Sequence, residues 1–371
     1  MRMKKILFLI HDLGHGGAEK VLVNLVNNMD PENFDITVLA LFGGGVNEQF
    51  LRPHIHYRTV FKKVFPGNSH LMKLFSPKQL HQWFIKEHYD IEVAYLEGPS
   101  ARVISGCPCK DTKLISWIHC TMKATEEAAL GFRTIEESQA CYGKMDAMVF
   151  VSEMVRDAFL KACPFPGKTE VLYNTNESDK ILALASEKAE LPHNVFCWCG
   201  VGKVVPIKGF DRMIQIQKRL SDEGYKTHLY ILGEGSQRAE LEKLAAESGV
   251  TDSVTFLGYQ TNPYKYVAKC DLFVCASHSE GFSTAATEAL IVGTPVCTVE
   301  VSGMKEMLGE HNEWGIVTEN DEEALYQGIK RLLDNPALMA HYKEKAAQRG
   351  KMFSTENTVK AVEDVLLELS K

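Results

Sequence analysis

The sequence lacks the long apolar segments that mark secreted and membrane proteins. No apolar run approaches the roughly 18 residues that a membrane-spanning helix needs. The apolar run at 6–10 is too short for the core of a signal peptide, and no small-residue cleavage site follows it. We therefore interpret residues 6–10 as a buried first strand and expect a cytoplasmic protein.

Disulfide and metal-binding patterns are also missing. The chain has 10 cysteines but contains no C-x-x-C pair and no zinc-type spacing. Cys275 and Cys297 lie in apolar, strand-like segments, where cysteine behaves as a small hydrophobic residue. We expect reduced thiols, no metal and no cofactor.

Acidic residues are absent from one stretch of an otherwise acidic chain. The sequence carries 41 Lys and Arg against 48 Asp and Glu, a net charge of −7. Residues 49–86 hold seven Lys and Arg and four His without a carboxylate, whereas residues 171–371 carry 21 Lys and Arg against 29 Asp and Glu. This balance excludes a general nucleic-acid binder, and we expect the stretch 49–86 to face a locally anionic partner.

Short apolar runs alternate with helix-period segments, a pattern typical of parallel α/β layers. A length of 371 residues favours two domains. We predict two Rossmann-like, doubly wound domains facing each other across a cleft. They are residues 1–182 with the closing helix 354–371, and residues 194–353, with a linker near 180–193. Strands are predicted at 6–10, 36–41, 91–95, 114–118, 147–151 and 171–173, then at 195–199, 228–232, 254–257, 272–276 and 295–299.

Two glycine-containing turns follow predicted strands. Gly14-His15-Gly16-Gly17 lets the backbone approach a ligand, and the next helix offers free N–H groups, although a plain tight turn is the alternative. Gly200-Val201-Gly202-Lys203 lacks the first glycine and the Ser or Thr of a Walker loop. With Lys208 nearby, Lys203 provides two point charges for a diphosphate, and the alternative is two solvated surface lysines.

A third segment places two carboxylates eight residues apart, Glu280 in a loop and Glu288 about one turn into a helix. The small residues between them leave the start of that helix open to a ligand. A phosphate can take the helix N–H groups while a carboxylate accepts hydrogen bonds from sugar hydroxyls. A single Glu is usually a solvated surface charge, but this context argues against that interpretation.

Seven short motifs follow one another along nearly the whole chain. They are Gly16-Gly17-Ala18-Glu19, Trp117-Ile118-His119, Gly202-Lys203, Lys208-Gly209-Phe210, Leu232-Gly233-Glu234-Gly235, Phe256-Leu257-Gly258-Tyr259 and the E-x7-E run from Glu280 to Glu288. In this order and at these separations, the chain resembles the retaining, GT-B-fold glycosyltransferases of family 4.

The resemblance implies transfer of a hexosyl or N-acetylhexosaminyl group in cell-surface polysaccharide synthesis, with retention and without a metal. The sugar would come from a nucleotide-sugar substrate, UDP-linked or as the runner-up GDP-mannose. It would go to a saccharide or polyprenyl-diphosphate-linked acceptor bound mainly by the first domain. No Asp-x-Asp motif is present. The departing phosphate would help to take the acceptor proton during front-face attack.

Residue by residue, the resemblance implies two catalytic residues, Glu280 beside the transferred sugar and His119 near the reacting carbon. For His119, a core histidine after an apolar strand is the alternative. The family usually has Arg where this chain has Lys203, which keeps the charge but loses the bidentate fork. The expected donor-binding residues are Gly16, Gly17, Lys203, Lys208, Gly281, Phe282, Ser283, Thr284 and, for the ribose, Glu288.

The basic stretch 49–86 also contains aromatic residues, and this combination suits the interface of an anionic bilayer. We hypothesise peripheral docking on the inner face of the membrane through Lys62, Lys63 and Lys73, which brings the enzyme to a lipid-linked acceptor. The alternative is a solvated basic face whose aromatic side chains turn into the core.

Two other functions compete with transfer. One is a GT-B relative that epimerises or hydrolyses nucleotide sugars, and the other is a two-domain sugar-binding protein without activity. The E-x7-E spacing and the basic acceptor-side stretch favour transfer over the first. The paired lysines and the lack of a signal peptide argue against the second.

Overall fold

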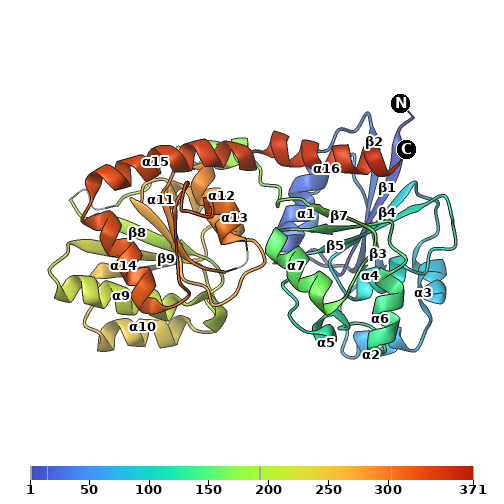
Figure 1. Ribbon diagram of the computed structural model, residues 1–371, viewed down its shortest axis with the longest axis horizontal. Coiled ribbons are helices and arrows are strands. Elements are labelled where there is room, and N and C mark those ends of the chain that lie inside the picture. The colour runs from blue at the N-terminus through green and yellow to red at the C-terminus, as the bar shows by residue number, and fades with distance from the viewer. Residues whose placement is uncertain (1, 15, 192–193, 302, 371) are drawn as a thin grey trace. The chain divides into compact units, whose positions relative to one another are not determined.

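The chain forms two compact α/β units (Figure 1). The first comprises Met1–Asn176 with Thr355–Lys371, and the second comprises Glu177–Ser354. The computed structural model describes residues 2–14, 16–191, 194–301 and 303–370.

The first unit is built around a seven-stranded sheet in the order β3-β2-β1-β4-β5-β6-β7, with every neighbouring pair parallel. Its strands are β1 Lys4–Ile10, β2 Phe34–Phe42, β3 His56–Phe61, β4 Ile91–Tyr95, β5 Lys113–Ile118, β6 Ala147–Phe150 and β7 Lys168–Val171. Its helices are α1 Gly17–Asn28, α2 Asn68–Lys73, α3 Pro77–Phe84, α4 Pro99–Ile104, α5 Thr125–Ala128, α6 Ile135–Tyr142, α7 Glu153–Ala162 and α16 Thr355–Leu369.

The second unit has a six-stranded parallel sheet in the order β10-β9-β8-β11-β12-β13. Its strands are β8 Phe196–Val201, β9 Thr227–Leu232, β10 Val254–Gly258, β11 Leu272–Cys275, β12 Val296–Val299 and β13 Ile316–Thr318. Its helices are α8 Ser178–Ala185, α9 Phe210–Asp222, α10 Arg238–Glu247, α11 Tyr264–Val267, α12 Thr284–Ile291, α13 Met304–Leu308, α14 Glu322–Leu333 and α15 Pro336–Gly350.

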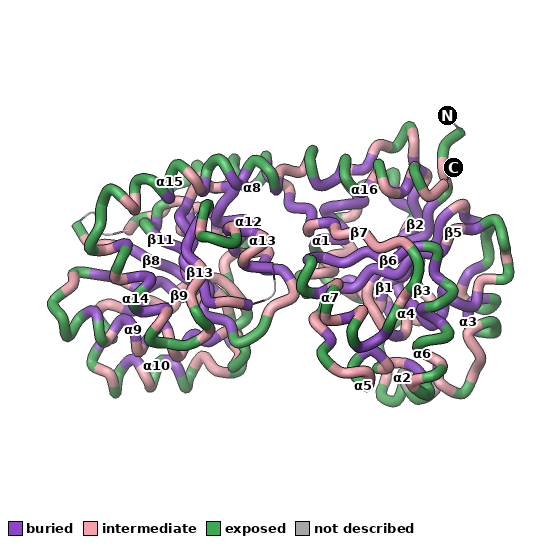
Figure 2. The backbone as a smooth tube through the Cα atoms, in the orientation of Figure 1, coloured by how far each residue is buried: buried purple, intermediate pink, exposed green. Residues whose placement is uncertain are grey.

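The predicted two-domain α/β class is confirmed, because each sheet is buried between helices. Figure 2 shows the buried strands inside each unit and the exposed residues on the outer faces of the helices. The central strand β1 illustrates the cause: its residues 6–10 are all apolar and fully buried. A parallel strand covered on both faces reads as a continuous apolar run, which is why such strands were found from sequence.

Four details of the prediction are wrong. The expected linker contains helix α8, which packs on α11 and α12, so the first unit ends near residue 176 rather than 182. Strand β3 was not predicted, because it is a partly exposed edge strand with the polar sequence HYRTVF. The short edge strand β13 was missed as well, and β7 begins three residues before the predicted 171–173.

The sheet orders fix where each unit can bind a ligand. In the first unit the order of strands reverses between β1 and β4, and in the second between β8 and β11. Open α/β sheets bind ligands in the crevice outside the carboxyl ends of the strands at such switch points. The loops after β1, β4, β8 and β11 are therefore the places where a site is expected.

The closing helix α16 belongs to the first unit, where it packs beside α1 (Figure 1). Its apolar stripe of Val359, Val362 and Leu366 is buried. At its end, Lys168 Nζ lies 2.9 Å from Glu368 Oε2. The chain thus returns to its first sheet after completing the second.

Candidate active site

In the second unit, the loops after β8 and β11 are joined at the switch point. The backbone N–H of His278 donates to the carbonyl oxygen of Ile207 at 2.8 Å. Gly209 has a φ of 64°, and a Cβ there would lie 2.1 Å from the carbonyl oxygen of Ala276. A glycine is required at this position because it tolerates both the left-handed backbone and the close approach.

This junction brings two predicted site residues together. Lys208 Nζ lies 2.5 Å from Glu280 Oε1, and Ser277 Oγ donates to the same oxygen at 2.7 Å. The Lys208 and Glu280 side chains are 28% and 12% exposed, so the pair is partly removed from water. The lysine expected to hold a phosphate is therefore already paired with the glutamate expected beside the sugar.

The other predicted lysine and an unpredicted arginine differ in their surroundings. Lys203 is exposed, and its side chain makes no hydrogen bond or ion pair within the described part of the chain. Arg212, in the first turn of α9, donates through Nη1 to Asn320 Oδ1 at 2.8 Å, and its Nη2 lies 2.8 Å from His278 Nδ1. Arg212 was missed from sequence, although a cation one helical turn after Lys208 was a usable signal.

The start of α12 is partly occupied by its own cap. Ser283 Oγ accepts a hydrogen bond from the backbone N–H of Ala286 at 3.3 Å. Phe282 is buried, with its ring centroid 6.0 Å from that of Phe353. The predicted contacts Gly281 and Thr284 flank these two residues in the chain. Phe282 therefore anchors the turn by packing, and Ser283 uses one helix N–H group that a phosphate would otherwise share.

Glu288 is a buried carboxylate in the second turn of α12, with 9% of its surface exposed. Its Oε1 accepts a hydrogen bond from the hydroxyl of Tyr264 at 3.0 Å. Tyr264 lies in α11 and is itself buried. The tyrosine fixes the orientation of the carboxylate, and nothing in the local sequence pattern pointed to it.

In the first unit, the loop after β1 is organised by Asp12. Its Oδ2 lies 2.6 Å from His11 Nδ1, and its Oδ1 accepts from the backbone N–H of Gly14 at 2.7 Å. His15 of the predicted glycine turn lies outside the described residues.

The predicted anion site at Gly16 and Gly17 holds a carboxylate of the protein itself. Gly16 is the N-cap of α1, and a Cβ on it would lie 1.9 Å from Glu19 Oε2. Burial raises the pKa of Glu19, and the charge of Asp12 adds to the shift. A carboxylate at a helix N-terminus is favourable, and a phosphate there would compete with it. A Cβ on Gly17, in contrast, would meet no atom within 4 Å.

His119 lies just after β5 in a buried aromatic cluster with Tyr95 and Trp117. The Tyr95 ring centroid is 4.5 Å from that of His119 and 5.0 Å from that of Trp117. Tyr95 Oη, Trp117 Nε1 and His119 Nε2 are all buried without a hydrogen-bond partner among the described residues. Three unsatisfied polar atoms from two adjacent strand ends point to a polar ligand, since buried polar groups in proteins are nearly always hydrogen-bonded.

Burial also fixes the charge of His119. Removal from water lowers the pKa of its imidazole to about 3, so the ring is neutral at neutral pH. Its backbone N–H donates to Glu97 Oε2 at 3.1 Å. His119 can therefore exchange hydrogen bonds with a hydroxyl but does not supply a positive charge. Of the three rings, only His119 was singled out as a site residue.

The basic stretch 49–86 folds as β3, α2, α3 and their connections. Lys62 and Lys63 are exposed and Lys73 is half-buried, and none of the three forms an ion pair with a carboxylate within the described residues. The aromatic residues divide into two groups. Phe61 packs on Phe65 and Phe84 with ring centroids 5.4 and 5.8 Å apart, whereas Trp83 is 47% exposed.

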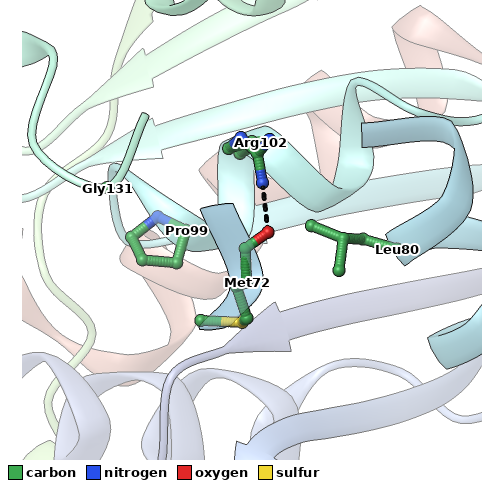
Figure 3. A pocket seen from close by; sticks show the side chains of 5 residues that line it. All are labelled: Met72, Leu80, Pro99, Arg102 and Gly131. Atoms are coloured by element: carbon green, nitrogen blue, oxygen red, sulfur yellow. Dashed lines mark hydrogen bonds between the residues drawn. The ribbon is translucent and has the colours of Figure 1, made fainter. Parts of the chain in front are cut away.

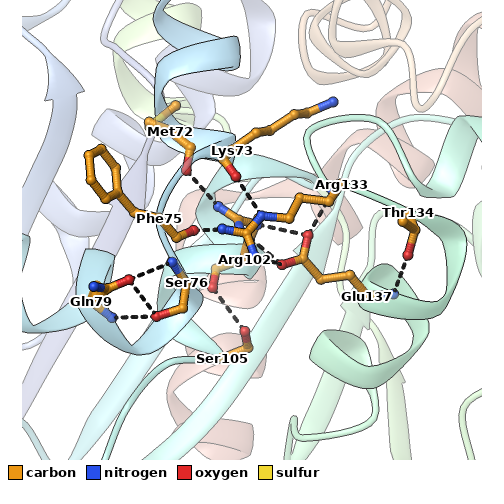
Figure 4. Close-up of polar contacts among 10 residues, drawn as sticks. All are labelled: Met72, Lys73, Phe75, Ser76, Gln79, Arg102, Ser105, Arg133, Thr134 and Glu137. Atoms are coloured by element: carbon orange, nitrogen blue, oxygen red, sulfur yellow. Dashed lines mark hydrogen bonds and ion pairs between the residues drawn. The ribbon is translucent and has the colours of Figure 1, made fainter.

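The buried guanidinium of Arg102 binds the backbone at the end of α2 (Figure 4). Its nitrogens donate to the carbonyl oxygens of Met72 at 2.9 Å and Phe75 at 2.7 Å, and pair with Glu137 Oε1 at 2.9 Å. The exposed side chain of Leu74, 72% accessible, lies between these two anchored carbonyls in sequence. The α2–α3 turn is thus fixed in place while its apolar tip faces water.

A small cavity of about 10 Å³ lies beside Arg102, with no room for a sugar. Its position next to the anchored end of α2 is visible in Figure 3. The lining residues are Met72, Leu80, Pro99, Arg102 and Gly131.

None of the helices in the described ranges combines the length and the apolar character required to cross a bilayer.

Family profiles match both units of the chain. The profile described as glycosyltransferase family 4 matches residues 15–176, and the profile of glycosyl transferases group 1 matches residues 184–349.

Characterised relatives match over almost the full length. A Campylobacter jejuni N-acetylgalactosamine-N,N'-diacetylbacillosaminyl-diphospho-undecaprenol 4-alpha-N-acetylgalactosaminyltransferase is 29% identical, over 98% of this chain and 99% of that enzyme. The lipopolysaccharide core biosynthesis glycosyltransferase LpsD of Rhizobium meliloti is 23% identical, over 97% of this chain and 96% of that enzyme.

Among solved structures, Anabaena HepE in complex with UDP superposes with a TM-score of 0.76 and 19% identity. The match covers 98% of this chain and 100% of that one. At this identity the likeness establishes the fold only. The profiles, the full-length relatives and the two switch-point sheets agree, and the chain belongs to the family 4 glycosyltransferases and has their two-domain GT-B fold.

Proposed function

We propose that the protein is a retaining, metal-independent glycosyltransferase acting in cell-surface glycan synthesis. It would move a hexosyl or N-acetylhexosaminyl group from a UDP-linked sugar to a lipid-linked saccharide. The observation that carries the proposal is the meeting of Lys208 with Glu280 at the switch point of the second sheet, with Glu288 buried in the helix that follows. The UDP complex of HepE and the diphospho-undecaprenol acceptor named for the Campylobacter jejuni relative support the choice of substrates.

Each part of the nucleotide-sugar donor has a suitable partner among the residues of the second unit. Lys208 and Lys203 supply positive charge for the diphosphate, together with N–H groups at the start of α12. Glu288, held by Tyr264, presents a fixed carboxylate to the ribose hydroxyls. Glu280 stands next to Lys208 and is assigned to the transferred sugar. When the diphosphate binds, Lys208 exchanges part of its contact with Glu280 for the phosphate.

The reaction breaks the bond between the anomeric carbon and the diphosphate oxygen and forms a bond from that carbon to an acceptor hydroxyl oxygen. The acceptor proton passes to the departing phosphate, which acts as the base. Negative charge grows on the leaving diphosphate, and lysines and helix N–H groups stabilise it without a metal. The resemblance assigns Gly16, Gly17 and His119 to the same donor, and the neutral imidazole of His119 suits a hydrogen bond to a sugar hydroxyl.

A labelled-donor assay tests the function. The protein is incubated with UDP-glucose, UDP-galactose, the two UDP-N-acetylhexosamines and GDP-mannose, each labelled in the sugar, and with polyprenyl-diphosphate saccharides. Label should appear on the lipid-linked product. Free sugar or an epimer would instead identify a hydrolase or epimerase. Absence of turnover with every acceptor, together with donor binding that Glu288→Ala leaves unchanged, would identify a binding protein.

We further propose that the enzyme docks peripherally on the inner, cytoplasmic face of the membrane. Lys62, Lys63 and Lys73 have no carboxylate partner within the described residues, and Leu74 and Trp83 expose apolar surface on the same segment. Cations beside exposed apolar side chains favour an anionic bilayer.

Flotation with anionic vesicles tests this docking. The triple variant Lys62→Glu, Lys63→Glu and Lys73→Glu should lose vesicle binding. A control with the same charge change at the exposed Lys226, Lys243 and Lys343 of the second unit should keep it. Unchanged binding after the first triple substitution would refute the proposal.

A further inference from the structure

A cluster of metal-ligating side chains lies in the first unit, away from the proposed active site. His81 of α3, Glu92 of β4 and Cys107 of the turn after α4 bring their ligating atoms within 4.8 Å of one another. The cluster involves none of the residues assigned to the sugar donor or the acceptor. We call it the His81–Glu92–Cys107 cluster.

Within the cluster, the carboxylate of Glu92 contacts both other side chains. His81 Nε2 lies 2.8 Å from Glu92 Oε2, and Cys107 Sγ lies 3.8 Å from Glu92 Oε1. The side chains of His81 and Glu92 are only 7% and 2% exposed. Each oxygen of the carboxylate therefore faces a different potential ligand, in a place where a charge is costly to bury.

Backbone packing holds the three elements in this arrangement. Ser76 and Gln79 form a capping box that fixes the first turn of α3, from which His81 projects one turn later. A Cβ on Gly106 would lie 2.1 Å from the carbonyl oxygen of Pro77, so the turn that carries Cys107 is pressed against the start of the same helix. The site is therefore preformed by the fold.

We propose that the His81–Glu92–Cys107 cluster binds a zinc ion as a structural site. An imidazole nitrogen, a thiolate and a carboxylate are the ligand types that Zn²⁺ takes, whereas Mg²⁺ and Ca²⁺ take oxygen. The thiol proton leaves to solvent as the zinc–sulfur bond forms. One thiolate and one carboxylate then balance the two positive charges of the ion, which leaves a neutral buried site.

The dimensions suit this ion after a small movement. Zinc bonds of about 2.0–2.3 Å in tetrahedral geometry place ligand atoms roughly 3.3–3.8 Å apart. Cys107 Sγ and Glu92 Oε1 are already 3.8 Å apart, and the separation of His81 Nε2 from Glu92 Oε2 must widen by about 0.5 Å. Ligand atoms that now lie up to 4.8 Å apart must close to the same range. Cys107 is partly exposed, so the ion can enter from its side and keep a water as fourth ligand.

Three protein ligands and a water are more common at catalytic zinc sites than at closed structural ones, and the structural role follows from the position in the fold alone. Glu92 is the second residue of β4, at the amino end of the strand, whereas the proposed active site uses carboxyl ends. Zinc there ties α3 to the sheet and to the turn before β5. The proposal is independent of the proposed function, because no step of the transfer reaction passes through these residues.

Zinc binding to the intact protein tests the proposal. The purified chain is treated with chelator, equilibrated with ZnCl₂, desalted and analysed for metal by mass spectrometry. We expect one zinc per chain in the wild type and none in Cys107→Ser or His81→Gln. Cys109→Ser and Cys120→Ser serve as matched controls and should retain the metal. Zinc should also raise the Tm of the wild type by about 2–4 °C and leave that of Cys107→Ser unchanged.

Cobalt provides a readout that does not depend on stability. Co²⁺ should give a thiolate charge-transfer band with the wild type and with Cys109→Ser, and none with Cys107→Ser. Cys107→Ser replaces only the sulfur with an oxygen, and an unchanged circular dichroism spectrum shows that the variant folds. No retained zinc in the wild type, equal zinc in Cys107→Ser, or loss of zinc in Cys120→Ser would each overturn the proposal.

Discussion

The switch points of the two sheets present opposite chemistry. In the second unit the loops carry charge, with Lys208 and Glu280 paired and partly exposed beside the cation Arg212. In the first unit the ends of β4 and β5 carry aromatic rings, and burial keeps the imidazole of His119 uncharged, while the loop after β1 holds the carboxylate of Asp12. The cations of the second unit fit the diphosphate of the proposed donor, and the unpaired polar atoms of the first unit fit its proposed sugar hydroxyls.

The difference shows that one fold, used twice in a chain, can carry charged side chains at one switch point and uncharged ring atoms at the other. Lysines near a loop-and-helix junction stabilise a leaving group whose charge grows during the reaction. Buried rings with unpaired polar atoms discriminate between ligands. A ligand that hydrogen-bonds to these atoms binds more tightly than one that leaves them buried without a partner.

The largest expected effect is on the charged side. Lys208→Met should lower kcat about 100- to 1,000-fold, because the leaving diphosphate loses a positive charge that stabilises it. Lys203→Met is the comparison, since this exposed lysine has no partner within the described residues and is assigned to the same diphosphate, and it should lower kcat measurably but less. Steady-state kinetics of sugar transfer measure both, and equal effects of the two substitutions would contradict the special place of Lys208.

Glycine substitutions separate structural from functional glycines in the two units. Gly209→Ala should destabilise the second unit by at least about 2 kcal/mol, because its φ of 64° and the nearby Ala276 carbonyl exclude a Cβ. Gly17→Ala meets no neighbouring atom, so thermal unfolding should be unchanged while transfer falls. A Gly17→Ala enzyme with full activity would remove Gly17 from the sugar-donor site.

His119 should leave a pH signature in the first unit. Its pKa is about 3 when folded and 6.5 in the reference state, so the unfolded chain binds a proton below pH 6.5 while the folded chain does not. The contribution of His119 to the free energy of unfolding is therefore fully present above pH 6.5. It falls by about 1.4 kcal/mol for each pH unit below that value, until about pH 3.

Urea unfolding at pH 7 and pH 5 measures this signature. From pH 7 to pH 5, the free energy of unfolding of His119→Phe should fall by about 2 kcal/mol less than that of the wild type. An identical loss in both proteins would show that the imidazole is not held neutral by burial.

The smallest expected effects come from removing one hydroxyl on each side. Tyr264→Phe deletes the hydrogen bond to Glu288 and should destabilise the second unit by about 1 kcal/mol. Tyr95→Phe deletes a hydroxyl without a partner among the described residues, so stability should be unchanged or slightly higher. If that hydroxyl binds a sugar, KM should rise about tenfold, by the loss of one hydrogen bond. Chemical denaturation and kinetics on both variants give the contrast.

Much of this architecture could be predicted from the sequence, because buried parallel strands are continuous apolar runs. Strands β1, β4 and β11 lie within a few residues of their predicted positions for this reason. The edge strand β3 escaped detection because only one of its edges is paired and much of its surface is in water, so its sequence can be polar. Helix α8 was taken for a linker, since its packing partners lie far away in the chain.

The site residues also divide into those that the sequence indicated and those that only the fold reveals. The sequence motifs singled out Glu280, Glu288 and Lys208 as candidate site residues, because the chain resembles family 4 glycosyltransferases at these positions. The motifs did not show that Lys208 and Glu280 pair, since that contact depends on the close approach of Gly209 to Ala276. Nor did they indicate Tyr264 or Tyr95, whose relevance arises from contacts across strands and helices.

By itself, the sequence determined the fold class and the family, because these follow from local apolar periodicity and short motifs. Only the tertiary structure decided which charges meet and which polar atoms are buried. It also brought His81, Glu92 and Cys107 together from three elements, where the cysteine spacing alone had suggested no metal. Spacing in a sequence describes neighbours along the chain, whereas ligands and pKa shifts depend on neighbours in space.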